Sequence, residues 1–201
     1  MGAIGFVTIE VVDAAAAEDF YRAAFGLDDR VRVRESGEPS TGFRGFTMSL
    51  VVAQPATVDG FIEAAVGAGA TVLKPAAKSL WGYGGGVQAP DGTIWTIASS
   101  SKKDAGPVTR DVDAVVLQLG VADVAASRRF YADRGLTVAK SYGSRYVEFD
   151  TGTIKVTLNK RAALAKTAGV APDGTGSHRI LIGGDAGAFT DPDGFVWQAA
   201  G

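Results

Sequence analysis

Short runs of apolar and β-branched residues recur along the whole chain. Residues 6–12 and 114–121 are two such runs, and their Val, Ile and Leu content is typical of β-strands. Each run leads to an aspartate, Asp13 or Asp123, whose carboxylate can cap the first N–H groups of a helix. An alanine-rich stretch follows each aspartate, with Phe-Tyr near its end and then Gly-Leu, and glycine suits the residue after a helix C-terminus. The pattern therefore predicts a strand followed by a capped helix near the start of each half.

Each half continues with short strands and ends on a Pro-Asp-Gly turn that leads into a last strand. Asp-Gly supplies the positive φ values that a tight hairpin needs. The first half also has apolar side chains at helical spacing over residues 57–70, whereas the second half has a short helix or lid over residues 160–170. The remaining expected strands cover residues 30–35, 46–52, 136–142, 145–149, 154–158 and 178–183.

The same order of motifs thus occurs twice in one chain. The offset between the two Pro-Asp-Gly turns is shorter than the offset between Asp13 and Asp123, so the halves differ in the length of their middles. Residues 98–111 are rich in Ser, Lys, Gly and Pro, which is typical of a linker. We expect one domain over residues 1–100, a linker over 101–111 and a second domain over 112–201.

Composition narrows the function classes. The 201 residues carry a net charge of −2 with both signs interspersed, which argues against a nucleic-acid partner. The absence of cysteine excludes disulfides, thiolate metal sites and cysteine nucleophiles. No signal-peptide pattern and no long uncharged apolar run is found, so no membrane contact is expected. These totals predict a cytoplasmic protein that acts on a small molecule.

The repeated order of motifs resembles the glyoxalase, bleomycin-resistance and extradiol-dioxygenase superfamily, also called vicinal oxygen chelate proteins. The resemblance covers nearly the whole chain. It implies an α+β fold in which tandem βαβββ modules form curved mixed sheets around a cavity for a small molecule. Each half corresponds to a compressed repeat, the first lacking strands in its first module and the second lacking the helix in its last. The resemblance leaves open whether the halves complete each other or a second subunit of a homodimer completes them.

Metal-using members of this superfamily carry His, Gln or Glu at particular strand positions. The corresponding residues of the first half are Phe6, Thr47 and Thr96, which do not make a metal site. Val116 takes the first of these positions in the second half and cannot donate an electron pair. The resemblance, combined with these residues, predicts a protein without a metal or other cofactor.

The second half leaves a metal-dependent alternative open. His178 is the only histidine and falls at one expected ligand position, Gln198 falls at another, and Glu148 could supply a third ligand. A divalent metal held there would make the protein a metal-dependent lyase, isomerase or dioxygenase. The structural alternative is that His178 only lines the cavity or forms hydrogen bonds within the sheet.

If the residues at the family's ligand positions face the cavity, the residues two positions away on the same strand face it too, because every second side chain lies on the same face. Trp95 and Trp197 should then face the helices and pack in the core. Trp81 and Tyr83 lie in a glycine-rich stretch, where three consecutive glycines allow a close backbone approach or a bulge and an aromatic ring can cover a cavity mouth. The expected ligand-binding residues are Phe6, Thr8, Glu10, Trp81, Tyr83, Thr96, Val116, Gln118, Tyr146, His178 and Gln198.

Three functions are compatible with such a cavity. The first is a protein that binds or sequesters an apolar or aromatic metabolite or antibiotic, with a role in resistance, as drug-sequestering members of the superfamily do. The second is the metal-dependent enzyme described above. The third is metal-free acid/base catalysis through Glu10 or Glu148, since a carboxylate in apolar surroundings can exchange protons near neutral pH. The catalytic candidates are therefore Glu10, Glu148 and His178, and the sequence does not decide whether the protein is an enzyme.

Overall fold

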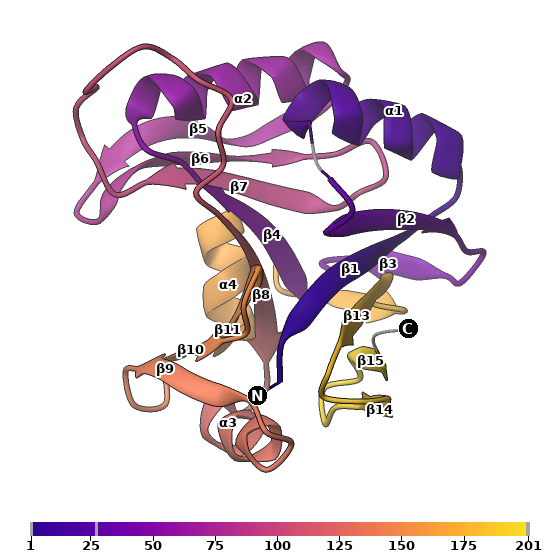
Figure 1. Cartoon of the computed structure of the whole chain (residues 1–201). Coiled ribbons are helices and arrows are strands. Elements are labelled where there is room, and N and C mark those ends of the chain that lie inside the picture. The colour runs from indigo at the N-terminus through magenta and orange to yellow at the C-terminus, as the bar shows by residue number, and fades with distance from the viewer. Residues whose placement is uncertain (1, 27, 200–201) are drawn as a thin grey trace.

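Strands and helices follow the order that the hydrophobic pattern predicts. The computed structural model describes residues 2–26 and 28–199. The elements of the first half are β1 (Ile4–Val11), α1 (Ala14–Phe25), β2 (Val31–Glu35), β3 (Ser40–Gly42), β4 (Phe46–Val51), α2 (Pro55–Gly67), β5 (Thr71–Ser79), β6 (Gly82–Gln88) and β7 (Ile94–Ser99). Those of the second half are β8 (Ala114–Val121), α3 (Val124–Ala132), β9 (Thr137–Ser141), β10 (Tyr146–Asp150), β11 (Ile154–Lys160), α4 (Arg161–Ala168), β12 (Gly174–Gly176), β13 (Ile180–Gly184), β14 (Phe189–Thr190) and β15 (Val196–Ala199) (Figure 1).

The predicted caps and hairpin turns are confirmed. The Asp13 carboxylate accepts a hydrogen bond from Ala16 N at 2.9 Å, and Asp123 accepts from two N–H groups of α3. Gly26 ends α1 with φ 60°, a left-handed conformation that glycine adopts without a steric cost. Gly92 and Gly194 have φ 89° and 92° in the two Pro-Asp-Gly turns.

An eight-stranded mixed sheet combines the two halves of the chain. Its strand order is β5-β6-β7-β4-β8-β11-β10-β9, so four strands come from each half. The halves meet where β4 pairs antiparallel with β8, from Phe46 opposite Leu119 to Val51 opposite Ala114. The halves therefore complete each other within one chain, a choice that the sequence left open.

A five-stranded sheet combines the two ends of the chain in the same way. Its strand order is β14-β15-β13-β1-β2, with β1 pairing antiparallel to β13 and parallel to β2. No helix occurs between β13 and β15 in the described part of the chain, as the compressed second repeat predicts. Each sheet is thus built from both repeats, and the division at residues 101–111 into two domains stays a prediction.

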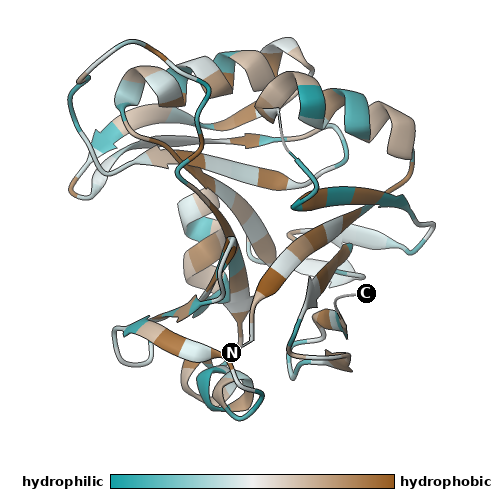
Figure 2. Cartoon of the chain, in the orientation of Figure 1, coloured by the Kyte–Doolittle hydropathy of each residue, from teal (hydrophilic) through white to brown (hydrophobic). Residues whose placement is uncertain are grey.

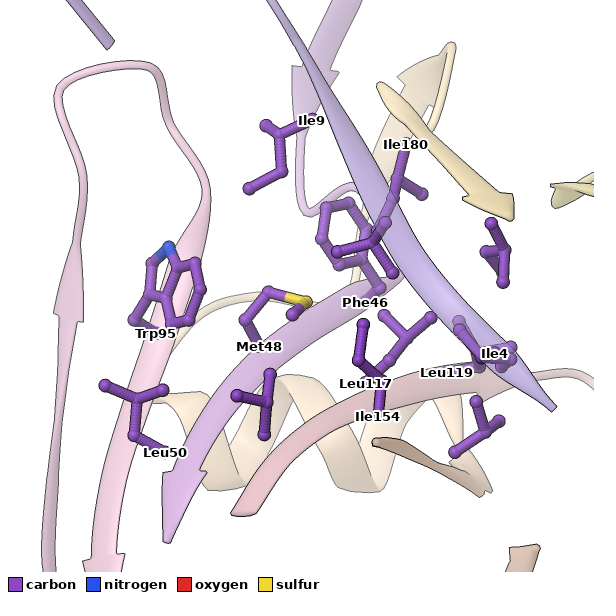
Figure 3. Close-up of a cluster of buried hydrophobic side chains, with 14 of the residues drawn as sticks. Ile4, Ile9, Phe46, Met48, Leu50, Trp95, Leu117, Leu119, Ile154 and Ile180 are labelled. Carbon is purple, nitrogen blue, oxygen red and sulfur yellow. The ribbon is translucent and has the colours of Figure 1, made fainter. Parts of the chain in front are cut away.

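The main hydrophobic core lies between the eight-stranded sheet, the five-stranded sheet and helices α1 to α3. Apolar residues alternate along the strands that enclose it (Figure 2). Ile4 of β1 lies beside Leu119 of β8, and Ile9 lies further along β1, on the side of Phe46 and Met48 of β4 (Figure 3). The buried side chains of β1 belong to the same core as those of β4 and β8. Burial of these side chains therefore fixes the five-stranded sheet, which contains β1, against the eight-stranded sheet. No helix in the described ranges is long and apolar enough to cross a membrane.

One expected strand begins later than its sequence pattern suggests. The apolar run at residues 178–183 predicts that His178 lies on a strand, but β13 begins at Ile180. Arg179 has φ 56°, the only positive value at a non-glycine residue among those described, and this conformation breaks the extended backbone before the strand. His178 therefore lies in the connection that leads into β13.

Candidate functional site

The two faces of the eight-stranded sheet have different partners. One faces the main core, and the other faces helix α4, so we call it the α4 face (Figure 1). Leu164 of α4 joins Phe43 and Ile94 in a second, smaller apolar cluster that covers one end of the α4 face. A Cβ at Gly120 would lie 3.1 Å from Arg161 Cα, which shows how closely this helix approaches β8. The other end of the α4 face stays open.

The open end contains a cavity of about 360 Å³, a volume in the range of small-molecule sites. Strands β5, β6 and β7 form most of its wall, and Thr167 of α4 closes one side. Of the residues expected to bind ligand, four line this cavity: Trp81, Tyr83, Thr96 and Gln118. The fold thus brings these four residues, three from the first half and one from the second, together at one cavity.

Three consecutive glycines of β6 shape the wall of the cavity. A Cβ at Gly85 would lie 2.8 Å from Ile62 Cδ1 of α2 and 2.9 Å from Ala76 N, where the β5–β6 register shifts. Of the two alternatives that the sequence offered, Gly85 permits the close backbone approach, and the β5–β6 pairing also has an irregular register beside it. A Cβ at Gly86, in contrast, would meet only ordinary contacts, none shorter than 3.7 Å. Gly84 is half-buried and Gly86 is buried, and both line the cavity with backbone alone.

The polar groups of the cavity floor are mostly neutral. Gln118 accepts a hydrogen bond from the Thr47 hydroxyl at 2.8 Å, which fixes the orientation of its amide. Ser49 lies between Thr96 of β7 and Val116 of β8 in the strand register. Lys74 and Lys78 of β5 are exposed at the rim and are the charged residues of the lining. The site thus offers hydroxyl, amide and ammonium groups around a flat backbone surface.

Trp81 and Tyr83 differ in their surroundings. Trp81 is 84% exposed at the tip of the β5–β6 hairpin, where its ring can approach the cavity mouth. The Tyr83 hydroxyl instead donates a hydrogen bond to Asp59 of α2 at 2.8 Å. This bond to a carboxylate raises the pKa of Tyr83. The Tyr83 side chain is therefore fixed against α2. The exposed Trp81 side chain can change its orientation when a ligand binds.

Tyr146 and Glu148 lie further along the eight-stranded sheet, on β10. The Tyr146 hydroxyl donates to the Glu148 carboxylate at 3.0 Å, and Lys155 Nζ lies 3.7 Å from the other carboxylate oxygen. Burial, followed by this hydrogen bond, raises the pKa of Tyr146 strongly, so the phenol stays protonated at neutral pH. Glu148 is engaged by both neighbours at once.

Phe6, Thr8, Glu10 and Gln198 belong to the five-stranded sheet instead. The Arg32 guanidinium lies 3.8 Å from the centre of the Phe6 ring, and that ring covers Gly183. Glu10 is 7% exposed and forms an ion pair with Arg34 at 2.5 Å. The structure thus places the predicted ligand-binding residues of β1 in a packed, ion-paired cluster away from the cavity on the α4 face.

His178 bridges two backbone carbonyl groups. Its Nδ1 lies 2.5 Å from Arg44 O and its Nε2 lies 2.9 Å from Asp193 O, while the ring stacks on Phe195 at a centroid distance of 4.0 Å. Both ring nitrogens are engaged, so no lone pair points to an open space. The structural alternative considered for His178 fits this geometry.

The residues of the metal-dependent alternative do not converge. Gln198 pairs with Gly183 in the five-stranded sheet, Glu148 lies in the eight-stranded sheet, and His178 lies in a connection between strands. Within the described ranges, no three His, Asp or Glu side chains are grouped closely enough to hold a metal ion. The residues present do not fit the metal centre that the resemblance would imply.

Trp95 and Trp197 face the helices, as predicted. Trp95 is fully buried and lies 4.8 Å from Phe25 of α1 between ring centroids. Trp197 is 2% exposed and its Nε1 donates to the Tyr131 hydroxyl of α3 at 3.3 Å. These rings hold the helices on the sheets, so they are core residues.

Several residues of the cavity were not expected from the sequence. Ser49 and Ala98 follow from period-two alternation, because each lies two residues from a predicted inward position. Lys74 gave no such signal, since the bulges in β5 shift its register. Thr167 reaches the cavity only because α4 folds back over the sheet, which a local pattern does not show.

Comparisons with known proteins bear on the fold. No family model matches the sequence, and no curated protein is significantly similar to it. Among solved structures, glyoxalase I from Zea mays aligns with a TM-score of 0.62 at 13% identity over 99% of this chain and 92% of its own. A putative dioxygenase from Bacillus subtilis aligns with a TM-score of 0.57 at 16% identity over 95% of this chain and 71% of its own.

These alignments confirm the predicted fold class. The chain has the glyoxalase-like α+β fold, with mixed sheets, over nearly its whole length. Identity below one fifth establishes the shared architecture alone, since one scaffold carries many different activities. The function has to be argued from the cavity itself.

Proposed function

We propose that the protein binds a small, flat, largely apolar or aromatic molecule in the cavity on the α4 face, without a metal ion. The observation that supports this proposal most is the lining of that cavity. Hydroxyl and amide groups surround bare backbone at Gly84 and Gly86, and neither histidine nor carboxylate is among the lining residues. A planar ring can lie against this glycine wall while Gln118 and Thr96 orient its polar substituents.

Two further features fit this ligand class. Trp81 is held on a hairpin tip beside the mouth and could stack on an aromatic ring. Lys74 and Lys78 would complement an electron-rich or acidic substituent at the edge of that ring. The lining contains no histidine or carboxylate. This favours binding over turnover and is the basis for proposing sequestration of a metabolite or antibiotic rather than catalysis.

A pocket-filling variant tests the proposal. In Gly86→Val the new side chain enters the cavity, and its Cβ has no contact shorter than 3.7 Å, so the fold should persist. We expect a ligand found by calorimetric titration of an aromatic metabolite and antibiotic panel to lose about tenfold or more in affinity, because one good contact surface is removed.

Gly5→Val is the matched control. It makes the same change on β1, where a Cβ meets nothing within 4 Å, and it should bind the ligand as the unmodified protein does. Equal affinity in both variants would place the ligand elsewhere. Conversion of the bound molecule into a product, followed by chromatography, would contradict a binding role.

A further inference from the structure

A second cavity lies outside the α4 face, between the N-terminal end of α1 and the turn that joins β6 to β7. Its volume is about 370 Å³. Two arginines line it, Arg44 from the segment between β3 and β4 and Arg179 from the residue before β13. Because these segments are far apart in the sequence, the cavity exists only in the assembled fold.

Arg179 is a buried cation that forms no ion pair with a carboxylate of the described residues. It is 8% exposed, and its guanidinium donates only to the backbone carbonyls of Ser36, at 3.0 Å, and Glu38. Its Nε has no hydrogen-bond partner among the described residues. A buried charge is normally paired, and an unmatched donor adds a further cost. Arg179 also has a positive φ of 56°, a strained conformation that its surrounding contacts have to maintain.

Arg44 is the second cation of the cavity, and its guanidinium forms no direct ion pair among the described residues. It donates to Asp91 O at 2.5 Å and to the Thr93 hydroxyl at 3.4 Å, both neutral acceptors. Burial lowers the pKa of Arg44, the nearby positive charge of Arg179 lowers it further, and the Asp91 carboxylate partly offsets both. None of the ion pairs formed by residues 2–26 and 28–199 includes Arg44 or Arg179.

The two carboxylates that also line the cavity are engaged elsewhere. Asp13 caps α1 through Ala16 N. Asp91 accepts the Tyr21 hydroxyl at 2.5 Å and Thr93 N at 2.6 Å. The Ser40 hydroxyl, also part of the lining, has no partner in the described ranges. The Ser40 hydroxyl and Arg179 Nε are thus buried donors at the wall of the cavity that the described residues leave unmatched.

The internal repeat shows what occupies this place in the second half. Asp193 has the same position in its Pro-Asp-Gly turn as Asp91, and its carboxylate accepts Ala122 N at 2.8 Å and the Ser127 hydroxyl at 3.2 Å. The equivalent residues of the first half are Val12 and Ala17, and both line the cavity. The second repeat thus fills with its own carboxylate the place that the first repeat leaves open.

We propose that this cavity binds the carboxylate group of a small molecule, with Arg44 and Arg179 as its cationic partners and Ser40 as a hydroxyl donor. Arginine forks match a carboxylate with two parallel hydrogen bonds. The volume leaves room for a ligand larger than the carboxylate alone. This site is separate from the cavity on the α4 face and does not depend on the function proposed for it.

Calorimetric titration with acetate and succinate tests the site, with chloride at equal ionic strength as the reference. We expect millimolar or tighter binding that each variant weakens about tenfold or more. Arg44→Gln removes a charged hydrogen-bond donor, and Arg179→Lys keeps the charge but removes the planar guanidinium fork. Arg145→Gln, which removes an exposed positive charge, should bind like the unmodified protein. Gly86→Val should also retain binding, because it fills only the cavity on the α4 face.

Ser40→Ala separates a ligand role from a structural one. Removal of an unmatched hydroxyl should leave the melting temperature unchanged or raise it, yet the variant should bind succinate more weakly. Unchanged affinity in Arg44→Gln and Ser40→Ala would overturn the proposal, even if Arg179→Lys failed to fold. Binding of inorganic phosphate without binding of either carboxylate, or no binding of any of the three anions, would also overturn it.

Discussion

Two tyrosines at equivalent repeat positions use aspartates at different positions of their turns. Tyr21 donates its hydroxyl to Asp91, the aspartate of the first Pro-Asp-Gly turn. Tyr131 instead donates to Asp191, which precedes the proline of the second turn. The Asp193 carboxylate instead accepts from Ala122 N, just before α3, and from the Ser127 hydroxyl of α3. The repeated sequence motif predicts a common architecture, but it does not predict which carboxylate accepts a hydrogen bond from which donor.

The pair of Tyr131 and Asp191 leads to a stability prediction at the residue scale. Tyr131→Phe removes the hydroxyl from a fully buried site and leaves both the Asp191 carboxylate and Trp197 Nε1 without that partner. We expect the free energy of unfolding, measured by urea titration, to fall by about 1–3 kcal/mol. Tyr146→Phe, whose hydroxyl is only half-buried, is the control and should lose less.

Burial raises the pKa of Asp191, although its hydrogen bonds oppose the shift. A carboxyl whose pKa is higher in the folded state contributes stability below its unfolded pKa of about 4, and that contribution is lost as the pH rises through the folded value. Asp191→Asn lacks this titration. Urea titrations from pH 4 upward should therefore show the unmodified protein losing stability relative to Asp191→Asn. A gain over the same range would contradict the assignment.

At the scale of elements, the predicted linker is an ordered segment held on the first half. The Gln54 side chain, just before α2, donates to Gly106 O and Pro107 O and accepts from Ala105 N and Gly106 N. Arg110 donates to Ala24 O at the end of α1 at 2.7 Å. The connection between the halves thus runs along α2 and fixes where β8 begins (Figure 1).

Gln54→Ala should loosen this segment. The change removes four hydrogen bonds from a side chain that is 5% exposed, so we expect a loss of about 1–3 kcal/mol in unfolding free energy. Hydrogen exchange should accelerate at residues 104–108 and at the start of α2. Gln88→Ala removes a single bond, to Gly92 O, and serves as the control. Equal exchange in both variants would show that Gln54 does not hold the segment.

The type and order of the elements could be predicted because each is encoded locally. Asp13 and Asp123 mark helix starts, and the β-branched runs mark strands. Neither signal depends on contacts between residues far apart in the sequence. The position of His178 could not be predicted, because a backbone break at Arg179 follows from contacts with a distant loop. The cavity on the α4 face was only partly predictable, since the helix that closes it and the bulges in β5 depend on tertiary packing.

At the scale of the whole molecule, the two sheets interlock the two repeats. The eight-stranded sheet joins them at β4 and β8, and the five-stranded sheet joins them at β1 and β13. Residues 1–100 alone would expose the edges of β1 and β4 together with the apolar face of Met48 and Ile9. The repeat unit of the sequence is therefore not expected to be the unit that folds.

Separate expression of residues 1–100 and 101–201 tests this expectation. Each fragment should lack cooperative thermal unfolding by circular dichroism, and mixing the two should restore it, because each sheet then regains its missing strands. The full chain under the same conditions is the control. Cooperative unfolding of an isolated fragment would instead support two independent domains divided at residues 101–111.

The central claim is that the cavity on the α4 face is the binding site for a flat small molecule. A crystal structure of the protein with the tightest ligand of the calorimetric panel tests it most directly. We predict ligand density over Gly84 and Gly86, within contact of Thr96 and Gln118 and without an intervening metal ion. Density on the Phe6 face of the five-stranded sheet, or a metal ion held by His178, would contradict this account.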